Sequence, residues 1–168
     1  MPTSNIALRL GRLADAASIA VMSRELIESG LGWSWTPARV VRSIRNRDTV
    51  TLIAADGARM VAFAIMHFGD EHAHLNLLAV RPSHQRKGVG TRLVDWLTES
   101  ARVAGVASIS LELRAVNDGA RRFYRALGFD DNAFIPGYYR GREMALRMTR
   151  ELRPANLQPM QWSMPKKS

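Results

Sequence analysis

A basic segment with two glycines, HQRKGVG at residues 84–90, lies between an apolar run and an amphipathic run. Residues 72–80 predict a strand, and residues 90–105 predict a helix because their apolar residues recur on one helical face. The first N–H groups of a helix are unpaired and partly positive, and glycine lets an anion approach the backbone closely. The segment therefore predicts a phosphate site, although a strand-to-helix turn with solvated basic residues fits the same letters.

Two common phosphate-loop patterns do not fit this segment. The dinucleotide pattern G-x-G-x-x-G requires a glycine where the chain has Leu93. In the pattern G-x-x-x-x-G-K-[ST] the lysine follows the glycine, whereas Lys87 precedes Gly88. Any phosphate site here belongs to another class.

Glu112 and His74 are candidates for acid–base chemistry. Glu112 shares one face of a predicted strand (108–114) with Ser110 and Arg114. A carboxylate on a covered strand is costly without a partner, so Glu112 is either a base or a member of an ion pair with Arg114 or another neighbour. His74 shares a strand face with His72 and Asn76. It could act as the base, line a pocket, or simply be a surface histidine.

The absence of certain ligand types narrows the chemistry. The chain has no cysteine, which excludes disulfides, thiolate metal sites and a cysteine nucleophile. His72 and His74 are too few for a metal site, because no third ligand is suggested nearby. We expect no bound metal.

The candidate residues lie on predicted helices and strands, which alternate in the second half of the chain. Helices are predicted at 14–29, 36–47, 90–105 and 117–128, the second capped by Thr36 and the last by Asn117. Strands are predicted at 49–55, 59–68, 72–80, 108–114 and within 137–148, and Asp130-Asp131 reads as a turn. This order predicts an α/β fold, a mixed sheet with helices on both faces.

Length and charge bound the class of protein. The 168 residues suit one domain, which we place at 1–149, with an extension at 150–168. The net charge of +9 suits a polyanionic partner, such as a phosphorylated cofactor or nucleic acid, although an arginine-rich composition would explain it equally well. No apolar stretch is long enough to span a membrane and the start lacks a secretory pattern, so we expect a cytoplasmic protein without a membrane partner.

Two blocks of the sequence resemble the GNAT superfamily of acyltransferases. LLAVRPSHQRKGVGTRLVDWL resembles its central Q/R-x-x-G-x-G/A motif, and LELRAVNDGARRFYRALGF resembles its next block. The second block is most similar to bacterial N-terminal acetyltransferases that modify a ribosomal protein's terminal alanine. Those relatives have Asn where this chain has Leu77, with Asn76 one position earlier. The resemblance implies a six- to seven-stranded mixed sheet that is splayed at its centre.

The resemblance also implies an acetyl-CoA site. Backbone groups of Leu78, Ala79 and Val80 would bind the pantetheine arm, and Asn117 would reach it. The pyrophosphate would be held by N–H groups of Gln85, Arg86, Lys87, Gly88, Val89, Gly90 and Thr91. Tyr124 would lie beside the thioester sulfur as the general acid, although core packing would also explain it, and Glu112 would be the base.

The acceptor side is implied less directly. In the family, the connection between the first two helices covers the acceptor site. In this chain that connection carries Trp33 and Trp35, which could line the site or simply anchor the loop. Together with His74, Asn76, Tyr138 and Tyr139 they form our candidate substrate pocket. The expected reaction is direct attack of a primary amine, from a protein N-terminus or a small molecule, in a ternary complex. The alternatives are a basic nucleic-acid- or ribosome-binding module and a non-catalytic relative that binds acetyl-CoA. The last strands of two copies could pair in a homodimer.

Overall fold

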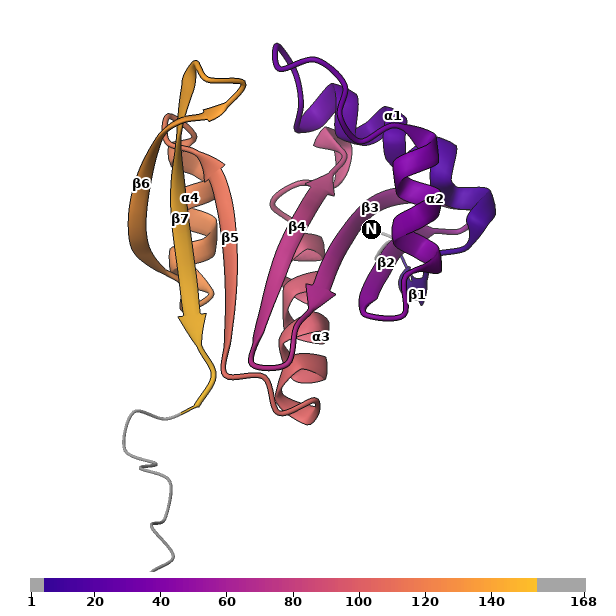
Figure 1. Ribbon diagram of the computed structural model, residues 1–168. Helices are drawn as coiled ribbons and strands as arrows, with labels where there is room; N and C mark the ends of the chain where they lie inside the picture. The colour runs from indigo at the N-terminus through magenta and orange to yellow at the C-terminus, as the bar shows by residue number, and fades with distance from the viewer. Residues whose placement is uncertain (1–4, 154–168) are drawn as a thin grey trace, which may run out of the picture.

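The sheet of the computed structural model has seven strands in the order β1-β2-β3-β4-β5-β7-β6 (Figure 1). The structure describes residues 5–153. The strands are β1 Ile6–Leu10, β2 Thr49–Asp56, β3 Arg59–Phe68, β4 His72–Val80, β5 Ser108–Arg114, β6 Asp130–Tyr139 and β7 Glu143–Glu151. Only β4 and β5 pair in parallel, and every other pair is antiparallel. The predicted mixed sheet is therefore confirmed.

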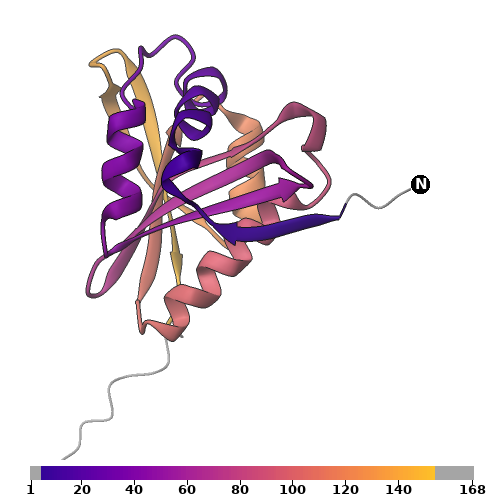
Figure 2. The same ribbon diagram turned by 90° about the vertical axis from the view of Figure 1, so that its right-hand side faces the viewer.

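Helices cover both faces of this sheet (Figure 2). They are α1 Ala16–Leu26, α2 Pro37–Arg45, α3 Val89–Val103 and α4 Asp118–Ala126. The helices α1 and α2 bury Ile19, Met22 and Val40 in one core, whereas α3 and α4 bury Leu93 and Tyr124 in the core on the opposite face. Burial of these apolar side chains on two faces fixes the sheet between two helical layers.

The centre of the sheet is splayed, as the resemblance implied. Pairing of β4 with β5 is restricted to His72 with Ser108, Ala73 with Ile109 and His74 with Ser110. Beyond His74 the two strands diverge, and Figure 1 shows β5, β7 and β6 leaning away from β4. The backbone groups of β4 that face β5 beyond this point have no strand partner among the described residues.

A register shift in β4 changes which side chains face which helices. Ile65 of β3 pairs with Leu77, but Met66 pairs with Leu75, so Asn76 is the extra residue of a β-bulge. Before the bulge Leu75 packs in the core under α3 and α4, and after it Leu77 packs in the core under α1 and α2. The bulge thus lies where the sheet opens.

The predicted helix starts are confirmed at both capped ends. The Thr36 hydroxyl accepts a hydrogen bond from the Arg39 backbone N–H at 3.4 Å, and the Asn117 side chain accepts one from the Ala120 N–H at 3.1 Å. Pro37 occupies the first turn of α2, where its missing N–H costs nothing.

Two sequence predictions about strands were wrong. The strand β1 was missed, although Ile6, Leu8 and Leu10 alternate with polar or small residues. Asp130-Asp131 begins β6 rather than forming a turn. The last strand predicted within 137–148 is confirmed as β7, which begins at Glu143 and continues to Glu151.

The predicted C-terminal extension lies mostly outside the described residues. Strand β6 forms one edge of the sheet, so strand pairing between two copies stays a prediction. Within residues 5–153, none of the helices has the length and apolarity needed to cross a membrane.

Candidate active site

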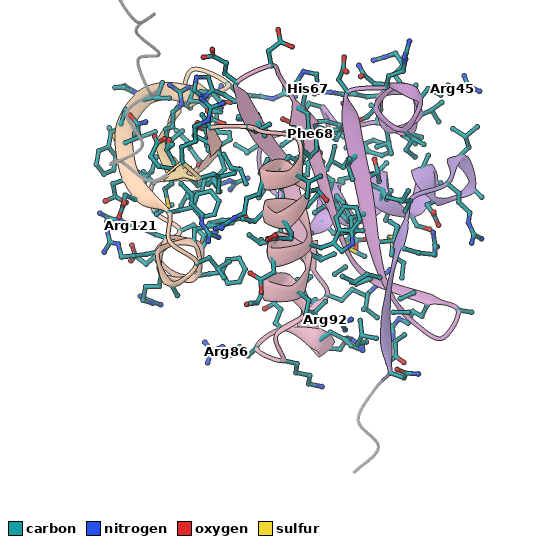
Figure 3. The ribbon with its side chains drawn as sticks, turned by 90° about the horizontal axis from the view of Figure 1, so that it is seen from below. Arg45, His67, Phe68, Arg86, Arg92 and Arg121 are labelled. Atoms are coloured by element: carbon teal, nitrogen blue, oxygen red, sulfur yellow. The ribbon has the colours of Figure 1, made fainter. Side chains whose placement is uncertain are left out.

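The predicted phosphate loop joins β4 to α3. Gly88 precedes the helix with φ +80°, a left-handed conformation that side chains with a Cβ rarely adopt. The unpaired N–H groups of the first turn of α3 therefore follow directly after a position where only glycine avoids strain. The Arg86 and Arg92 side chains lie near this end of α3 in Figure 3. The loop thus offers backbone donors at a basic end of the molecule.

A cavity of about 640 Å³ lies against this loop. Ten of the predicted cofactor residues line it: Leu78, Val80, Gln85, Arg86, Gly88, Val89, Gly90, Thr91, Asn117 and Tyr124. Gly90 has a packing role here, because a Cβ at that position would lie 3.1 Å from Cζ of Phe123. The close approach of α3 to α4 forms one wall of the cavity.

The side chains of four residues at or near this cavity point elsewhere or have partners within the protein. Ala79 turns its methyl group to the core under α1 and α2, so only its backbone could reach a ligand. Lys87 is exposed on the loop. The Gln85 side chain donates a hydrogen bond to the Val80 carbonyl at 2.9 Å. Arg92 donates to the Ile6 carbonyl at 2.8 Å, which ties α3 to β1.

A second cavity, of about 260 Å³, occupies the opening between β4 and β5. It shares Asn117 and Tyr124 with the loop cavity. It shares Asn76, Glu112 and Tyr139 with a third cavity, of about 420 Å³, on the opposite side of the opening. The three cavities therefore follow one another from the phosphate loop through the splayed sheet.

Glu112 lies at the middle of this path and is held by two neighbours. Its side chain is 7% exposed. One carboxylate oxygen accepts a hydrogen bond from Nε of Arg147 at 2.9 Å, and the other is hydrogen-bonded to Nε2 of His74. The other ring nitrogen of His74 is hydrogen-bonded to the Asn76 side-chain oxygen. Asn76, His74, Glu112 and Arg147 thus form one polar chain across the opening.

Glu112 does form an ion pair, the alternative to a base role, and its partner is the neighbouring Arg147 rather than Arg114. Arg147 stands directly opposite Glu112 in the antiparallel pair of β5 and β7. Arg114 instead donates to the carbonyls of Ile27 and Ser29 and lies 3.8 Å from a carboxylate oxygen of Glu143. Strand order decides which arginine meets the carboxylate, and strand order was not readable from the sequence.

The pKa values of this pair move apart. Burial alone would raise the pKa of Glu112, but the hydrogen bonds from His74 and Arg147 outweigh it and hold the pKa below its ordinary value of 4.5. The hydrogen bond to Glu112 raises the pKa of His74 above 6.5, against the opposing effect of burial. Glu112 is therefore an ionised carboxylate near neutral pH, and the contact with Glu112 stabilises the protonated form of His74.

Tyr124 is buried where the first two cavities meet. Its ring packs edge-on against Phe123 at 5.0 Å and Phe129 at 5.6 Å between centroids. Burial raises the pKa of Tyr124 well above its ordinary value of 10, so the phenol keeps its proton. Tyr124 therefore packs in the core and also lines both cavities.

The third cavity contains most of the predicted substrate residues. Its walls include Trp35, His74, Asn76, Tyr138 and Tyr139. Burial raises the pKa of Tyr139 to about 12, so this phenol is also neutral. For Trp33 the structure favours loop anchoring over a pocket role, because its indole N–H donates to the Ala20 carbonyl at 3.1 Å and its ring packs on the core under α1. Trp33 anchors the connection after α1 and is absent from the lining of this cavity.

Sequence reasoning missed Glu28, which shapes the same cavity. Its buried carboxylate accepts hydrogen bonds from the Ser34 N–H at 2.8 Å, the Trp35 N–H at 3.2 Å and the Ser23 hydroxyl at 3.1 Å. It therefore fixes the connection between α1 and α2 against the third cavity. A lone glutamate near a helix end gives no sequence signal for this role.

His72 and His74 are used in polar contacts with the protein itself. Nδ1 of His72 lies 2.7 Å from the Ser108 hydroxyl, and His74 contacts Glu112 and Asn76. In residues 5–153 there is no group of three or more His, Cys, Asp or Glu side chains placed to hold a metal ion.

The chain is similar in sequence to characterised bacterial acetyltransferases. The chain is 39% identical over 93 residues to the ribosomal protein bS18-alanine N-acetyltransferase of Escherichia coli K12, which is 54% of this chain and 63% of that protein. It is 32% identical over 110 residues to the N-alpha-acetyltransferase RimI of Mycobacterium tuberculosis, which is 63% of this chain and 68% of that protein. The match thus spans about two thirds of each relative.

Solved structures and a family model agree with these relatives. The ribosomal-protein-S18-alanine N-acetyltransferase from Escherichia coli superposes with a TM-score of 0.76 at 26% identity, covering 91% of this chain and 99% of the other. Ard1 from Thermoplasma volcanium gives a TM-score of 0.78 at 26% identity, with 89% and 99% covered. The model of the acetyltransferase (GNAT) family matches residues 20–129, which is more than half of the sequence. The chain belongs to the GNAT acetyltransferase family.

Proposed function

We propose that this protein is an acetyl-CoA-dependent N-acetyltransferase that acts on the α-amine of a protein N-terminus. The observation that carries the proposal is the run of cavities from the phosphate loop, past Tyr124 and Glu112, to the acceptor side of the splayed sheet. An acyl donor entering from one face and an amine entering from the other would meet at Glu112. The family match favours this function over a nucleic-acid-binding module.

The donor would occupy the first two cavities. Its pyrophosphate would accept hydrogen bonds from the N–H groups between Gln85 and Thr91, where the helix start also favours negative charge. Its pantetheine arm would pair with the β4 backbone beyond His74, which has no strand partner on that side. The thioester would then lie beside Tyr124.

The acyl transfer needs two proton movements. The neutral amine nitrogen attacks the thioester carbonyl carbon, and the carbonyl electrons move onto oxygen. When the tetrahedral intermediate collapses, the C–S bond breaks and Tyr124 gives its proton to the leaving sulfur. Glu112 accepts the proton that the new amide nitrogen loses, directly or through one water. The products are the acetylated amine and the free thiol of CoA.

The acceptor class follows from chemistry and from the relatives. An α-amine has an ordinary pKa of about 7.7–8.0, so a sizeable fraction is neutral at physiological pH, whereas a lysine amine with a pKa of about 10.4 is almost fully charged. The ionised Glu112 is a weak base, which suits the more acidic amine. The relatives named as N-terminal or alanine acetyltransferases support the same class.

Calorimetry with acetyl-CoA tests the donor site first. The wild type should bind at micromolar concentration, and Gly88→Glu or Gly90→Glu should abolish binding by placing a carboxylate against the pyrophosphate. Gly57→Glu is the matched control, because Gly57 also has a positive φ and lies in the turn between β2 and β3. Absence of binding in the wild type would overturn the proposal.

Amine screening with free-thiol detection then tests the acceptor. A peptide with a terminal alanine should be acetylated, and the same peptide with a blocked terminus and a free lysine should not. Transfer to the lysine peptide alone would contradict the N-terminal assignment.

A further inference from the structure

The third cavity, where the proposed function places the acceptor, has charged side chains of opposite sign at its inner end and toward its mouth. Its inner end holds the carboxylate of Glu112, where the proposed reaction places the amine. Arg39 of α2 and Arg140 of the turn between β6 and β7 line the same cavity. Both arginines are exposed, which places them toward the mouth. The cavity thus offers an anion to the amine and two cations to whatever follows it.

Each of these guanidinium groups lies close to a part of the α1–α2 connection or of α2. The Arg39 guanidinium carbon lies 3.9 Å above the Trp35 ring centroid, a cation–π contact that fixes it against the wall. Arg140 reaches Gly32 in the α1–α2 connection, where an added Cβ would lie 2.6 Å from Nη2 of Arg140. Figure 1 shows this connection and the β6–β7 turn at the same end of the molecule, on either side of the opening.

Neither arginine is neutralised within residues 5–153. The ion pairs of the described chain include neither Arg39 nor Arg140. The two carboxylates of this cavity have other partners, because Glu112 is bonded to His74 and Arg147, and Glu28 accepts from the α1–α2 connection. Two positioned cations therefore face the acceptor with their charge uncompensated.

We propose that Arg39 and Arg140 form an anion subsite that selects acceptor peptides carrying Asp or Glu in the residues directly after the acetylated terminus. This inference rests on the proposed function and names its substrate class. Guanidinium groups bind carboxylates through charge-assisted hydrogen bonds, and their planar forks can make two at once. An acidic acceptor would place its ammonium near Glu112 and its carboxylates near the mouth.

Peptide binding to the CoA-loaded protein tests the subsite without requiring turnover. Three peptides begin with Ala and carry Glu-Glu, Gln-Gln or Lys-Lys at the second and third positions. We expect the Glu-Glu peptide to bind about tenfold more tightly than the Gln-Gln peptide, which is a difference of roughly 1.4 kcal/mol in binding free energy. The Lys-Lys peptide should bind most weakly. Calorimetry gives all three dissociation constants.

Variants show whether the preference belongs to these arginines. The double variant Arg39→Gln, Arg140→Gln should bind the Glu-Glu and Gln-Gln peptides equally. Arg142→Gln is the matched control, since Arg142 is exposed in the same turn but does not line the cavity, and it should keep the preference. High salt should shrink the difference in the wild type, because the Debye length falls from about 10 Å at 0.1 M to about 3 Å at 1 M.

The outcomes separate this inference from the proposed function. Equal or weaker binding of the Glu-Glu peptide, binding of none of the three, or a preference that survives the double variant would each overturn the subsite. Acetylation of the Gln-Gln peptide is scored separately. It reports the N-acetyltransferase activity whatever the charge preference proves to be.

Discussion

At the scale of single residues, the shifted pKa values favour Glu112 over His74 as the base. The pKa of Glu112 is lowered, so its carboxylate is ionised near neutral pH, whereas the raised pKa of His74 makes its neutral, proton-accepting form less available. We therefore expect Glu112→Gln to lower kcat by about 100-fold or more, the range of general base catalysis. His74→Gln should cost much less. Steady-state thiol release measures both, and a larger loss in His74→Gln would make histidine the base.

The pH profile gives an independent check of the same assignment. Since the pKa of Glu112 lies below 4.5, this carboxylate does not titrate between pH 6 and 9. The rate in that interval should rise with the deprotonation of the acceptor α-amine, at about 7.7–8.0. The same rise should persist in His74→Gln. A rising limb that moves with the His74 substitution would contradict the assignment.

Tyr124 permits a test in which the fold is barely changed. Tyr124→Phe removes one hydroxyl and keeps the ring that packs on Phe123 and Phe129. We expect kcat to fall by roughly 100-fold, as for loss of a general acid, while acetyl-CoA affinity and the melting temperature stay close to those of the wild type. Unchanged kcat would leave Tyr124 as a packing residue.

At the scale of elements, the sequence predicted best where local chemistry alone decides the structure. Thr36 and Asn117 cap their helices because short polar side chains reach the free N–H groups of the first turn. The alternation in residues 108–114 correctly placed Glu112 on the less buried face. These features depend on neighbours within four residues.

Elements that depend on distant partners were predicted poorly. The contact between Glu112 and Arg147 exists because β7 inserts between β5 and β6, an order that no local pattern encodes. The role of Glu28 depends on how the chain folds back at Ser34, and the side chain of Trp33 turns toward α1 rather than toward the acceptor. The family motifs pointed to residues that do line one cavity, because much of its wall comes from one contiguous loop.

The α1–α2 connection is held in place by hydrogen bonds to the buried carboxylate of Glu28. Glu28→Ala would leave the Ser34 and Trp35 N–H groups without their acceptor, at a cost of roughly 1–3 kcal/mol in the free energy of unfolding. The KM for the acceptor peptide should rise, with acetyl-CoA affinity unchanged. Urea unfolding and peptide kinetics measure the two effects. Glu25→Ala, an exposed change on the same helix, should do neither.

At the scale of the whole molecule, the fold consists of two half-sheets joined at one end. Strands β1–β4 and strands β5–β7 meet in three residue pairs, and the hydrogen bond between His74 and Glu112 lies at the last of these pairs. The opening is therefore bounded by a titratable contact. The carboxylate that we propose as the base also links the two half-sheets.

The stability of this junction should depend on pH in a predictable direction. The pKa of His74 is raised in the folded state, so its contribution is complete below 6.5 and is lost as pH rises through the folded value. The pKa of Glu112 is lowered, so its contribution is complete above 4.5 and is lost as pH falls through the folded value. The pair therefore stabilises the fold most between about pH 4.5 and 6.5.

His74→Gln provides the measurement for this window. The difference in free energy of unfolding between wild type and variant, followed by urea denaturation from pH 4 to 9, should be largest inside the window and shrink above pH 6.5. His72→Gln is the matched control, because His72 bonds to Ser108 on the same strand pair but has no carboxylate partner within residues 5–153. A His74 difference that is constant with pH would show that the contact does not titrate, and the junction would then depend on backbone pairing alone.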